Sequence, residues 1–285
     1  GEAGVYLGGN IGKPTLDFLD KLTPQSIVVL ELSSFQLQDM TKSPHIAVML
    51  MTTREHLDYH KDIKEYVDAK RNILRFQGSS DFAIINRDYP ATLESDVYSE
   101  GKVYFVSRER SGYEGCFVED DALWILKDGK KTRIISNSQI RIPGKHNLEN
   151  ACAAIMAADL AGVSKENMVS VLKTFKGLEH RLELVREVNG VRYYDDSFST
   201  TPETAIAAIQ AFKTPEILIL GGSSKNSDFT ELGRVISSKD NIKAIIGIGK
   251  ECDRIKKKFP TSPRLRGASK IQILEGLMYM RSIVQ

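Results

Sequence analysis

Short apolar runs alternate with amphipathic stretches along the first half of the chain. The runs at 26–30, 45–50 and 82–85 are rich in β-branched residues and predict buried strands. Between the last two, residues 62–76 place apolar side chains at helical spacing, and Asp62 stands at the N-cap position. Strands that alternate with helices in this way are typical of a mostly parallel sheet covered by helices.

The pattern changes after residue 102. From 103 to 140, alternating apolar positions and the turn signal Asp128-Gly129 predict a small antiparallel insertion. An Ala-rich helix is predicted over 147–161, ended by Gly162, and a further helix over 165–175.

A second α/β unit is predicted from residue 178 onward. A hairpin over 184–195 turns at Asn189-Gly190. After it come predicted helices at 202–212 and 228–238 and predicted strands at 216–220 and 242–248. We therefore expect an α/β fold of two domains, with a mostly parallel sheet and a small antiparallel insertion in residues 1–177, and a smaller Rossmann-like domain in residues 178–285.

Composition narrows the class of protein. The chain has 285 residues, 27% charged and 41% hydrophobic, and its 39 basic and 37 acidic residues give a net charge of +2, so we expect no nucleic-acid partner. The longest apolar run, 46–51, is far below the roughly 20 residues of a membrane span. Cys116, Cys152 and Cys252 form no C-x-x-C pair, which favours a reducing compartment, the cytoplasm.

Four polar loops lie at or beyond predicted strand ends, where open α/β sheets bind ligands. The first, Gly8 to Thr15, is similar to a phosphate loop, but Leu7 and Pro14 stand where the pattern G-x-x-x-x-G-K-S/T requires other residues. With the Asn10 amide it either holds a polar ligand or is only the turn before Pro14. The second begins with Glu31, which is either a Mg²⁺ ligand beside two hydroxyls or a solvated acid.

The other two loops leave alternatives open as well. The third holds Glu55, His56, Asp58 and His60, which are able to bind a metal although their spacing matches no zinc pattern. The fourth, 144–150, begins a predicted helix, where free N–H groups favour anions, unless Asn147 is simply its N-cap.

Eight short strings resemble, in this order along the chain, the motifs of the muramyl (Mur) ligases. They are Gly9 to Gly12, Glu31 to Leu37, His56 to Asp58, Ala69-Lys70, Gly144 to Asn150, Gly177 to Glu183, Asp196-Ser197 and Gly221 to Lys225. The string around Phe35 resembles the branch of the family that adds D-glutamate.

The resemblance implies an activity. Family members phosphorylate a substrate carboxylate with ATP, and the incoming amine attacks the acyl phosphate. This implies an ATPase-type central domain, ATP with Mg²⁺ at two sites, and the substrates UDP-N-acetylmuramoyl-L-alanine and D-glutamate in peptidoglycan precursor synthesis. We expect a cytoplasmic monomer.

The resemblance also implies roles for single residues. Glu31 would hold one Mg²⁺, and His56 with a carbamylated Lys70 a second, because a carbamate offers anionic oxygens where an ammonium repels the metal. Arg181 would reach the transferring phosphate as the second domain closes, so the implied catalytic residues are Lys70, His56 and Arg181. The implied nucleotide contacts are Asn147, Asn150, Arg181, Asp196 and Ser197, and the implied substrate contacts are Asn10, Ser33, His56, Thr200 and Lys225.

Some positions depart from the family pattern. Met51 and Glu55 stand where the family has Asn and Asp, and Phe198 stands in place of a lysine. The family's glycine-rich ATP loop and uridine-binding domain have no match, so we expect a chain cut at both ends that does not turn over alone. The alternatives are a non-catalytic relative that binds a nucleotide or UDP-sugar, and a sister amide ligase for another amino acid.

Overall fold

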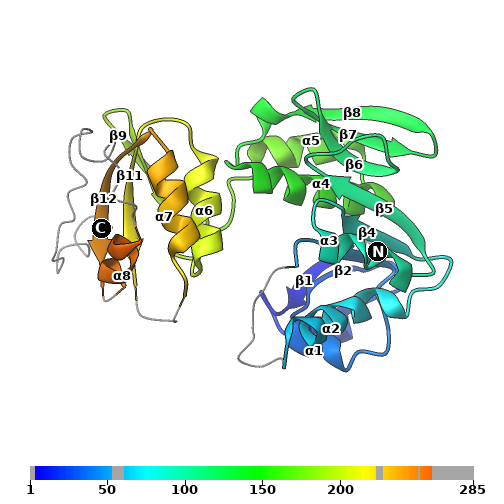
Figure 1. Ribbon diagram of the computed structural model, residues 1–285. Coiled ribbons are helices and arrows are strands. Elements are labelled where there is room, and N and C mark those ends of the chain that lie inside the picture. Colours follow the sequence, from blue (N-terminus) through cyan, green and yellow to red (C-terminus); the bar gives the residue numbers. More distant parts are fainter. Residues whose placement is uncertain (1–3, 53–60, 223–226, 250, 259–285) are drawn as a thin grey trace. The chain divides into compact units, whose positions relative to one another are not determined.

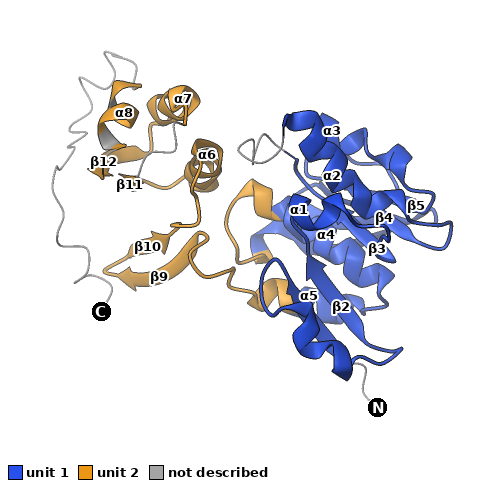
Figure 2. Cartoon of the chain, turned by 90° about the horizontal axis from the view of Figure 1, so that it is seen from below, with its two compact units in different colours: residues 1–138, 148–170 blue, residues 139–147, 171–285 orange. Residues whose placement is uncertain are grey.

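The structure is a computed structural model that describes residues 4–52, 61–222, 227–249 and 251–258. The chain divides into two compact units, shown in two colours in Figure 2. Unit 1 comprises residues 1–138 and 148–170, and unit 2 comprises residues 139–147 and 171–285. The boundary expected after residue 177 stays a prediction.

A six-stranded sheet forms the centre of unit 1, in the order β3-β4-β5-β6-β7-β8 (Figure 1). The strands are β3 (Ile46–Met49), β4 (Phe82–Asn86), β5 (Lys102–Ser107), β6 (Gly115–Glu119), β7 (Ala122–Lys127) and β8 (Lys130–Ser136). Neighbours from β3 to β6 run parallel, and β6, β7 and β8 run antiparallel. The strands predicted at 45–50 and 82–85 are confirmed.

The predicted start of the antiparallel insertion was wrong. Strand β5 pairs in parallel with β4, because the crossover between them contains the helices α3 (Pro90–Leu93) and η2 (Asp96–Tyr98). Strand β6 approaches β5 so closely that a Cβ on Gly115 would lie 1.8 Å from the Phe105 carbonyl oxygen. The antiparallel strands thus continue the main sheet.

Helices complete unit 1, namely α1 (Ser34–Gln38), α2 (Ile63–Arg75), α4 (Lys145–Leu160), which begins in unit 2, and α5 (Lys165–Thr174), which ends in unit 2. The predicted cap of α2 is confirmed, because the Asp62 side chain accepts a hydrogen bond from the Glu65 amide. Leu74 of α2 packs into a core with Ala47, Met49, Ala83 and Ile85.

Helix α4 begins two residues earlier than predicted. Asn147 therefore lies inside the first turn, where its backbone amide donates to the Gly144 carbonyl, and the N-cap interpretation of Asn147 is wrong. The predicted stop is confirmed, since Gly162 adopts the left-handed conformation (φ +81°) that ends many helices.

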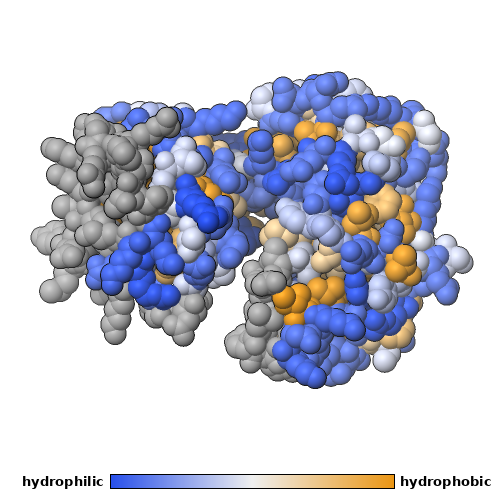
Figure 3. Space-filling model, in the orientation of Figure 1, coloured by the Kyte–Doolittle hydropathy of each residue, from blue (hydrophilic) through white to orange (hydrophobic). Residues whose placement is uncertain are grey.

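A separate two-stranded parallel sheet pairs β1 (Val5–Gly9) with β2 (Ile27–Glu31), joined by the 3-10 helix η1 (Thr15–Lys21). Side chains such as Val5, Leu7 and Val29 are exposed, and hydrophobic residues gather over β1 in the space-filling view (Figure 3). This small sheet thus keeps an apolar face that the described residues do not cover.

Unit 2 holds a hairpin and a small α/β layer. Strands β9 (Glu183–Val188) and β10 (Val191–Asp195) are antiparallel, and their turn at Asn189 and Gly190 has positive φ at both residues, as predicted. Strands β11 (Glu216–Gly221) and β12 (Ile242–Ile248) are parallel, with helices α6 (Pro202–Ala211), α7 (Thr230–Ser238) and α8 (Cys252–Lys257). Among the described residues, every helix is too short or too polar to cross a bilayer.

Candidate functional site

The first two predicted ligand loops meet at the carboxyl ends of β1 and β2. Gly9 is in register with Glu31, and the Asn10 backbone amide donates to the Glu31 carbonyl over 2.7 Å. The Asn10 side-chain amide also donates to Oε1 of Glu31 over 3.2 Å. Gly9 (φ +105°) is required here, because a Cβ would lie 2.2 Å from the Glu31 carbonyl oxygen. Two residues 21 positions apart thus form one polar site.

Ser33 starts helix α1 directly after this site. Its hydroxyl accepts from the Gln36 amide over 3.3 Å, and Oε1 of Gln36 accepts from the Ser33 amide over 2.9 Å. This is a reciprocal capping box, which satisfies two free N–H groups of the helix end. The structure therefore gives Ser33 a local role, and its substrate contact stays a prediction.

Helix α1 is anchored to α2, the helix of Lys70. The Asn72 side chain, which is 7% exposed, donates to the Leu37 and Gln38 carbonyls over 2.9 Å each. Lys70 is half-buried, with Nζ 5.1 Å from the centre of the Tyr66 ring. Asn72 thus ties the segment that follows Glu31 to the helix that contains Lys70.

The donor set at this edge fits Mg²⁺. Glu31 offers an exposed carboxylate, the hard oxygen ligand that Mg²⁺ prefers, and the Asn10 amide orients it without adding a cation. An unmodified Lys70 ammonium does not fit a metal site, whereas its carbamate does. His56 and Lys225 lie outside the described residues, and their predicted roles stay predictions.

The predicted nucleotide contacts on α4 lie one helical turn apart. Asn147 and Asn150 are three residues apart and therefore share a side of the helix. The Asn147 side chain donates to the Pro143 carbonyl over 2.6 Å, and Asn150 is exposed.

In unit 2, Arg181 stands between two anchored residues. The ring Nδ1 of His180 lies 2.7 Å from Oδ2 of Asp195, and the Leu182 amide donates to Oδ1 of Asp196 over 3.0 Å. Both neighbours of Arg181 have positive φ (62° and 46°), a conformation that costs energy for residues other than glycine and often marks functional sites. The hydrogen bond to Asp195 raises the pKa of His180, and the same contact lowers the pKa of Asp195.

The other predicted residues of unit 2 follow β10 in one loop. Asp196 also accepts from the Ser199 hydroxyl, the Ser197 amide donates to Oδ1 of Asp195 over 2.9 Å, and the Thr200 amide donates to the Phe198 carbonyl over 2.9 Å. The Phe198 amide donates to the His180 carbonyl over 3.0 Å, so this contact and the one between Leu182 and Asp196 hold the loop of Asp196, Ser197 and Thr200 against the Arg181 turn. Phe198, the departure from the family pattern, is 61% exposed.

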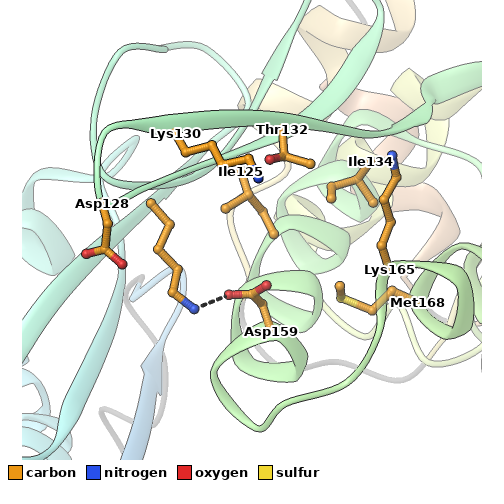
Figure 4. Close-up of a pocket in the computed structure, with 9 residues that line it drawn as sticks. Ile125, Asp128, Lys130, Thr132, Ile134, Asp159, Lys165 and Met168 are labelled. Atoms are coloured by element: carbon orange, nitrogen blue, oxygen red, sulfur yellow. Dashed lines mark hydrogen bonds and ion pairs between the residues drawn. The ribbon is translucent and has the colours of Figure 1, made fainter.

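A cavity of about 400 Å³ lies elsewhere in unit 1, between β7, β8, α4 and α5 (Figure 4). Nζ of Lys127 and Oδ2 of Asp159 form an ion pair of 2.6 Å inside it. None of the predicted site residues lines this cavity, so we do not assign it to the candidate site.

Sequence reasoning missed two parts of the site region. Glu149 is 4% exposed, and its pKa is raised by burial although the Arg108 charge opposes that shift. A signal was present, because Glu149, Cys152, Ala153 and Met156 are spaced as one helix stripe that is otherwise apolar. The pairing of His180 with Asp195 left no such signal, since 15 residues separate them.

Two family models match the chain. The Mur ligase middle domain matches residues 11–158, and the Mur ligase, glutamate ligase domain matches residues 180–274.

Named relatives match most of the chain. It is 43% identical over 253 residues to the UDP-N-acetylmuramoylalanine--D-glutamate ligase of Acetivibrio thermocellus, covering 88% of the chain and 53% of that protein. It is 38% identical over 266 residues to the enzyme of the same name from Symbiobacterium thermophilum, covering 93% of the chain and 56% of that protein. The chain spans about half the length of the curated relatives it matches.

Solved structures share the fold. MurF from Acinetobacter baumannii superimposes with a TM-score of 0.65 at 19% identity, covering 90% of the chain and 65% of that structure. The MurF ligase from Thermotoga maritima in complex with ADP gives a TM-score of 0.62 at 18% identity, covering 89% of the chain and 69% of that structure. The predicted α/β class with a mostly parallel central sheet is confirmed.

Proposed function

Because the chain belongs to the Mur ligase family, we propose that it forms the central and C-terminal parts of an ATP-dependent ligase that joins D-glutamate to UDP-N-acetylmuramoyl-L-alanine. The names of relatives 38–43% identical to the chain support the choice of amino acid and of the peptidoglycan precursor. ATP and a UDP-linked sugar are cytoplasmic metabolites, so we place the reaction in the cytoplasm.

The observation that carries the proposal is the contact of Asn10 with Glu31. Both side chains stand at the carboxyl ends of adjacent parallel strands, where α/β sheets bind their ligands, and they come from two separate motifs of the family. A carboxylate held by a neutral amide keeps its negative charge available to a cation.

Glu31 would hold one Mg²⁺, and His56 with a carbamylated Lys70 would hold a second. Bound there, Mg²⁺ would neutralise charge on the phosphates of ATP and on the carboxylate that receives the phosphoryl group. Asn72 supports this assignment, because it fixes the helix that follows Glu31 against the helix of Lys70.

Arg181 would supply a preorganised positive charge to the transferred phosphoryl group. The anchored neighbours His180 and Leu182 fix the backbone of this arginine, which lowers the reorganisation that the transition state requires. Asn147, Asn150, Asp196 and Ser197 would contact the nucleotide.

The two substrates would use other residues of the same motifs. Asn10, Ser33 and His56 would contact the muramyl substrate, Thr200 would contact the amino acid, and Lys225 would pair with a carboxylate of D-glutamate. The amine of D-glutamate then attacks the acyl phosphate, and inorganic phosphate leaves.

Phosphate release by the protein at its natural length tests the proposal. ATP and UDP-N-acetylmuramoyl-L-alanine are supplied with D-glutamate, L-glutamate or L-lysine. Of these three amino acids, we expect only D-glutamate to cause phosphate release. Release that requires L-glutamate or L-lysine instead would indicate a sister ligase. No release with any amino acid would indicate a non-catalytic relative.

A further inference from the structure

A buried carboxylate lies at the start of α4, beside the proposed nucleotide contacts. Glu149 is 4% exposed, and its two oxygens receive three donors. Nη1 of Arg108 lies 2.8 Å from Oε1, the Tyr89 hydroxyl donates to Oε1 over 3.2 Å, and Nδ2 of Asn86 donates to Oε2 over 2.9 Å. Burial of a carboxylate is costly unless it is paired in this way, so the contacts hold the side chain firmly.

The donors all come from the carboxyl ends of β4 and β5. Asn86 is the last residue of β4, Tyr89 precedes α3, and Arg108 follows β5. Asp88 ties these loops together, because its amide donates to Oδ1 of Asn86 over 2.9 Å and its Oδ2 accepts from the Arg108 amide over 2.8 Å. Glu149 therefore connects α4 to the sheet edge where a ligand is expected.

Helix geometry links Glu149 to the proposed nucleotide contact Asn150. Glu149 lies on the inward stripe with Cys152 and Met156, whereas Asn150 is exposed. Consecutive residues of an α-helix are rotated by about 100°, so a fixed Glu149 also fixes the direction of Asn150.

We propose that Glu149 is a positioning residue for the nucleotide: its contacts with Arg108 and Asn86 hold the first turns of α4 so that Asn150 meets ATP. This inference rests on the proposed function, because it takes Asn150 as a nucleotide contact.

The donor pattern explains why a carboxylate is needed. A glutamine at this position would point its NH₂ group either at the Asn86 NH₂ group or at the Arg108 guanidinium, and both of these groups only donate. The Tyr89 hydroxyl, which is able to accept, would not relieve the contact with Arg108. The Asn86 side chain could turn its oxygen toward this glutamine only by giving up the hydrogen bond that the oxygen accepts from the Asp88 amide. The substitution Glu149→Gln therefore leaves a buried donor facing a donor.

The same pattern provides a matched rescue. In the double variant Asn86→Asp with Glu149→Gln, the new Asp carboxylate accepts both from the glutamine NH₂ group and from the Asp88 amide. The count of negative charges stays as in the wild type. Tyr89→Phe is a milder second variant that removes one hydrogen bond and keeps the ring, and Glu166→Gln on the exposed side of α5 is the control.

The test measures the Kd for ADP by calorimetry and the KM values for ATP and D-glutamate, in the protein at its natural length. For Glu149→Gln we expect a Kd for ADP and a KM for ATP raised about tenfold, the equivalent of one charge-assisted hydrogen bond, with the KM for D-glutamate unchanged. We expect a smaller rise for Tyr89→Phe and none for Glu166→Gln. The double variant should return both nucleotide constants to near the wild-type values.

An unchanged Kd for ADP in folded Glu149→Gln would overturn the inference. It would also be overturned if all KM values rose together and the double variant restored none of them, since that marks a merely structural role. A wild-type protein that binds ADP but shows no D-glutamate-dependent phosphate release would overturn the proposed function alone, and the Kd values would still test Glu149.

Discussion

The side-chain amide of Asn10 lies 3.2 Å from Oε1 of Glu31, and the Asn10 backbone amide lies 2.7 Å from the Glu31 carbonyl oxygen. Two hydrogen bonds between the same residues fix both the strand end and the carboxylate. The carboxylate is thereby oriented by a neutral amide, which does not compete with a metal ion as a cation would. This relationship underlies the first of the predictions below.

Substitution of Asn10 by Ala should weaken Mg²⁺ binding while leaving the proposed ligand Glu31 in place. Loss of a group that orients a metal ligand typically lowers metal affinity about 10–100-fold, so we expect the Mg²⁺ concentration for half-maximal phosphate release to rise at least about tenfold. Glu31→Gln removes the ligand itself and should raise that concentration further. A Mg²⁺ titration of each variant measures this. The control is Glu100→Gln, an exposed acid away from the site. If Asn10→Ala and Glu31→Gln keep the Mg²⁺ requirement of the wild type and of the control, Glu31 is not a metal ligand.

Asn72→Ala should lower the free energy of unfolding by about 1–3 kcal/mol, because it leaves the Leu37 and Gln38 carbonyls without their donor. Chemical denaturation monitored by circular dichroism measures the loss. Asn167→Ala on the exposed side of α5 is the control and should change stability little. Equal effects of the two substitutions would show that Asn72 does not anchor α1.

Arg181→Ala should lower kcat by about 10²–10³, as for the loss of one donor that stabilises transition-state charge. Steady-state phosphate release measures kcat, and Arg186→Ala on the exposed strand β9 serves as the charge-matched control. An unchanged kcat for Arg181→Ala would remove this residue from the proposed mechanism.

The contact between His180 and Asp195 should make stability depend on pH with a definite sign. The hydrogen bond to Asp195 raises the pKa of His180 above its usual 6.5. The contribution of His180 to the free energy of unfolding is therefore complete at low pH and is lost as pH rises through the raised pKa. The hydrogen bond to His180 lowers the pKa of Asp195 below its usual 3.8, so the contribution of Asp195 to the free energy of unfolding is lost only as pH falls through the lowered pKa.

An NMR titration of the His180 ring should therefore give a pKa above 6.5, and Asp195→Asn should reduce it. The titration of the wild-type His180 ring is the reference for the variant. A His180 pKa that Asp195→Asn does not change would contradict the assignment.

Carbamylation of Lys70 predicts a requirement for CO₂. Phosphate release should fall in buffer depleted of CO₂ and recover when bicarbonate is added, because the carbamate forms reversibly. Lys70→Ala should be inactive with or without bicarbonate, whereas Lys64→Ala on the exposed side of the same helix should behave as the wild type. Wild-type activity that is indifferent to CO₂ would exclude the carbamate.

Local signals in the sequence predicted most elements of the fold. Asp62 predicted the start of α2 and Asn189-Gly190 predicted the turn between β9 and β10, because a cap and a tight turn each depend on neighbouring residues. The pairing of β5 was predicted wrongly, because an apolar strand pattern does not show whether its partner runs parallel or antiparallel.

The candidate site was predictable in its residues but not in its contacts. Glu31 and Asn10 belong to separate motifs, and only the parallel pairing of β1 with β2 brings them together. The helix stripe of Glu149 signalled a buried acid, but its partners Arg108 and Asn86 lie 41 and 63 residues away in the chain, beyond the range of any helical or strand period.

The most direct test of the proposed ligase is a reaction with UDP-N-acetylmuramoyl-L-alanine labelled with ¹⁸O in its carboxylate, together with ATP, Mg²⁺ and D-glutamate. The products are analysed by mass spectrometry. We predict a product extended by one D-glutamate and inorganic phosphate that carries one ¹⁸O atom, because the acyl phosphate gives a carboxylate oxygen to the departing phosphate. An extended product with unlabelled phosphate would contradict the acyl-phosphate route, and the absence of any D-glutamate product would contradict the proposed function.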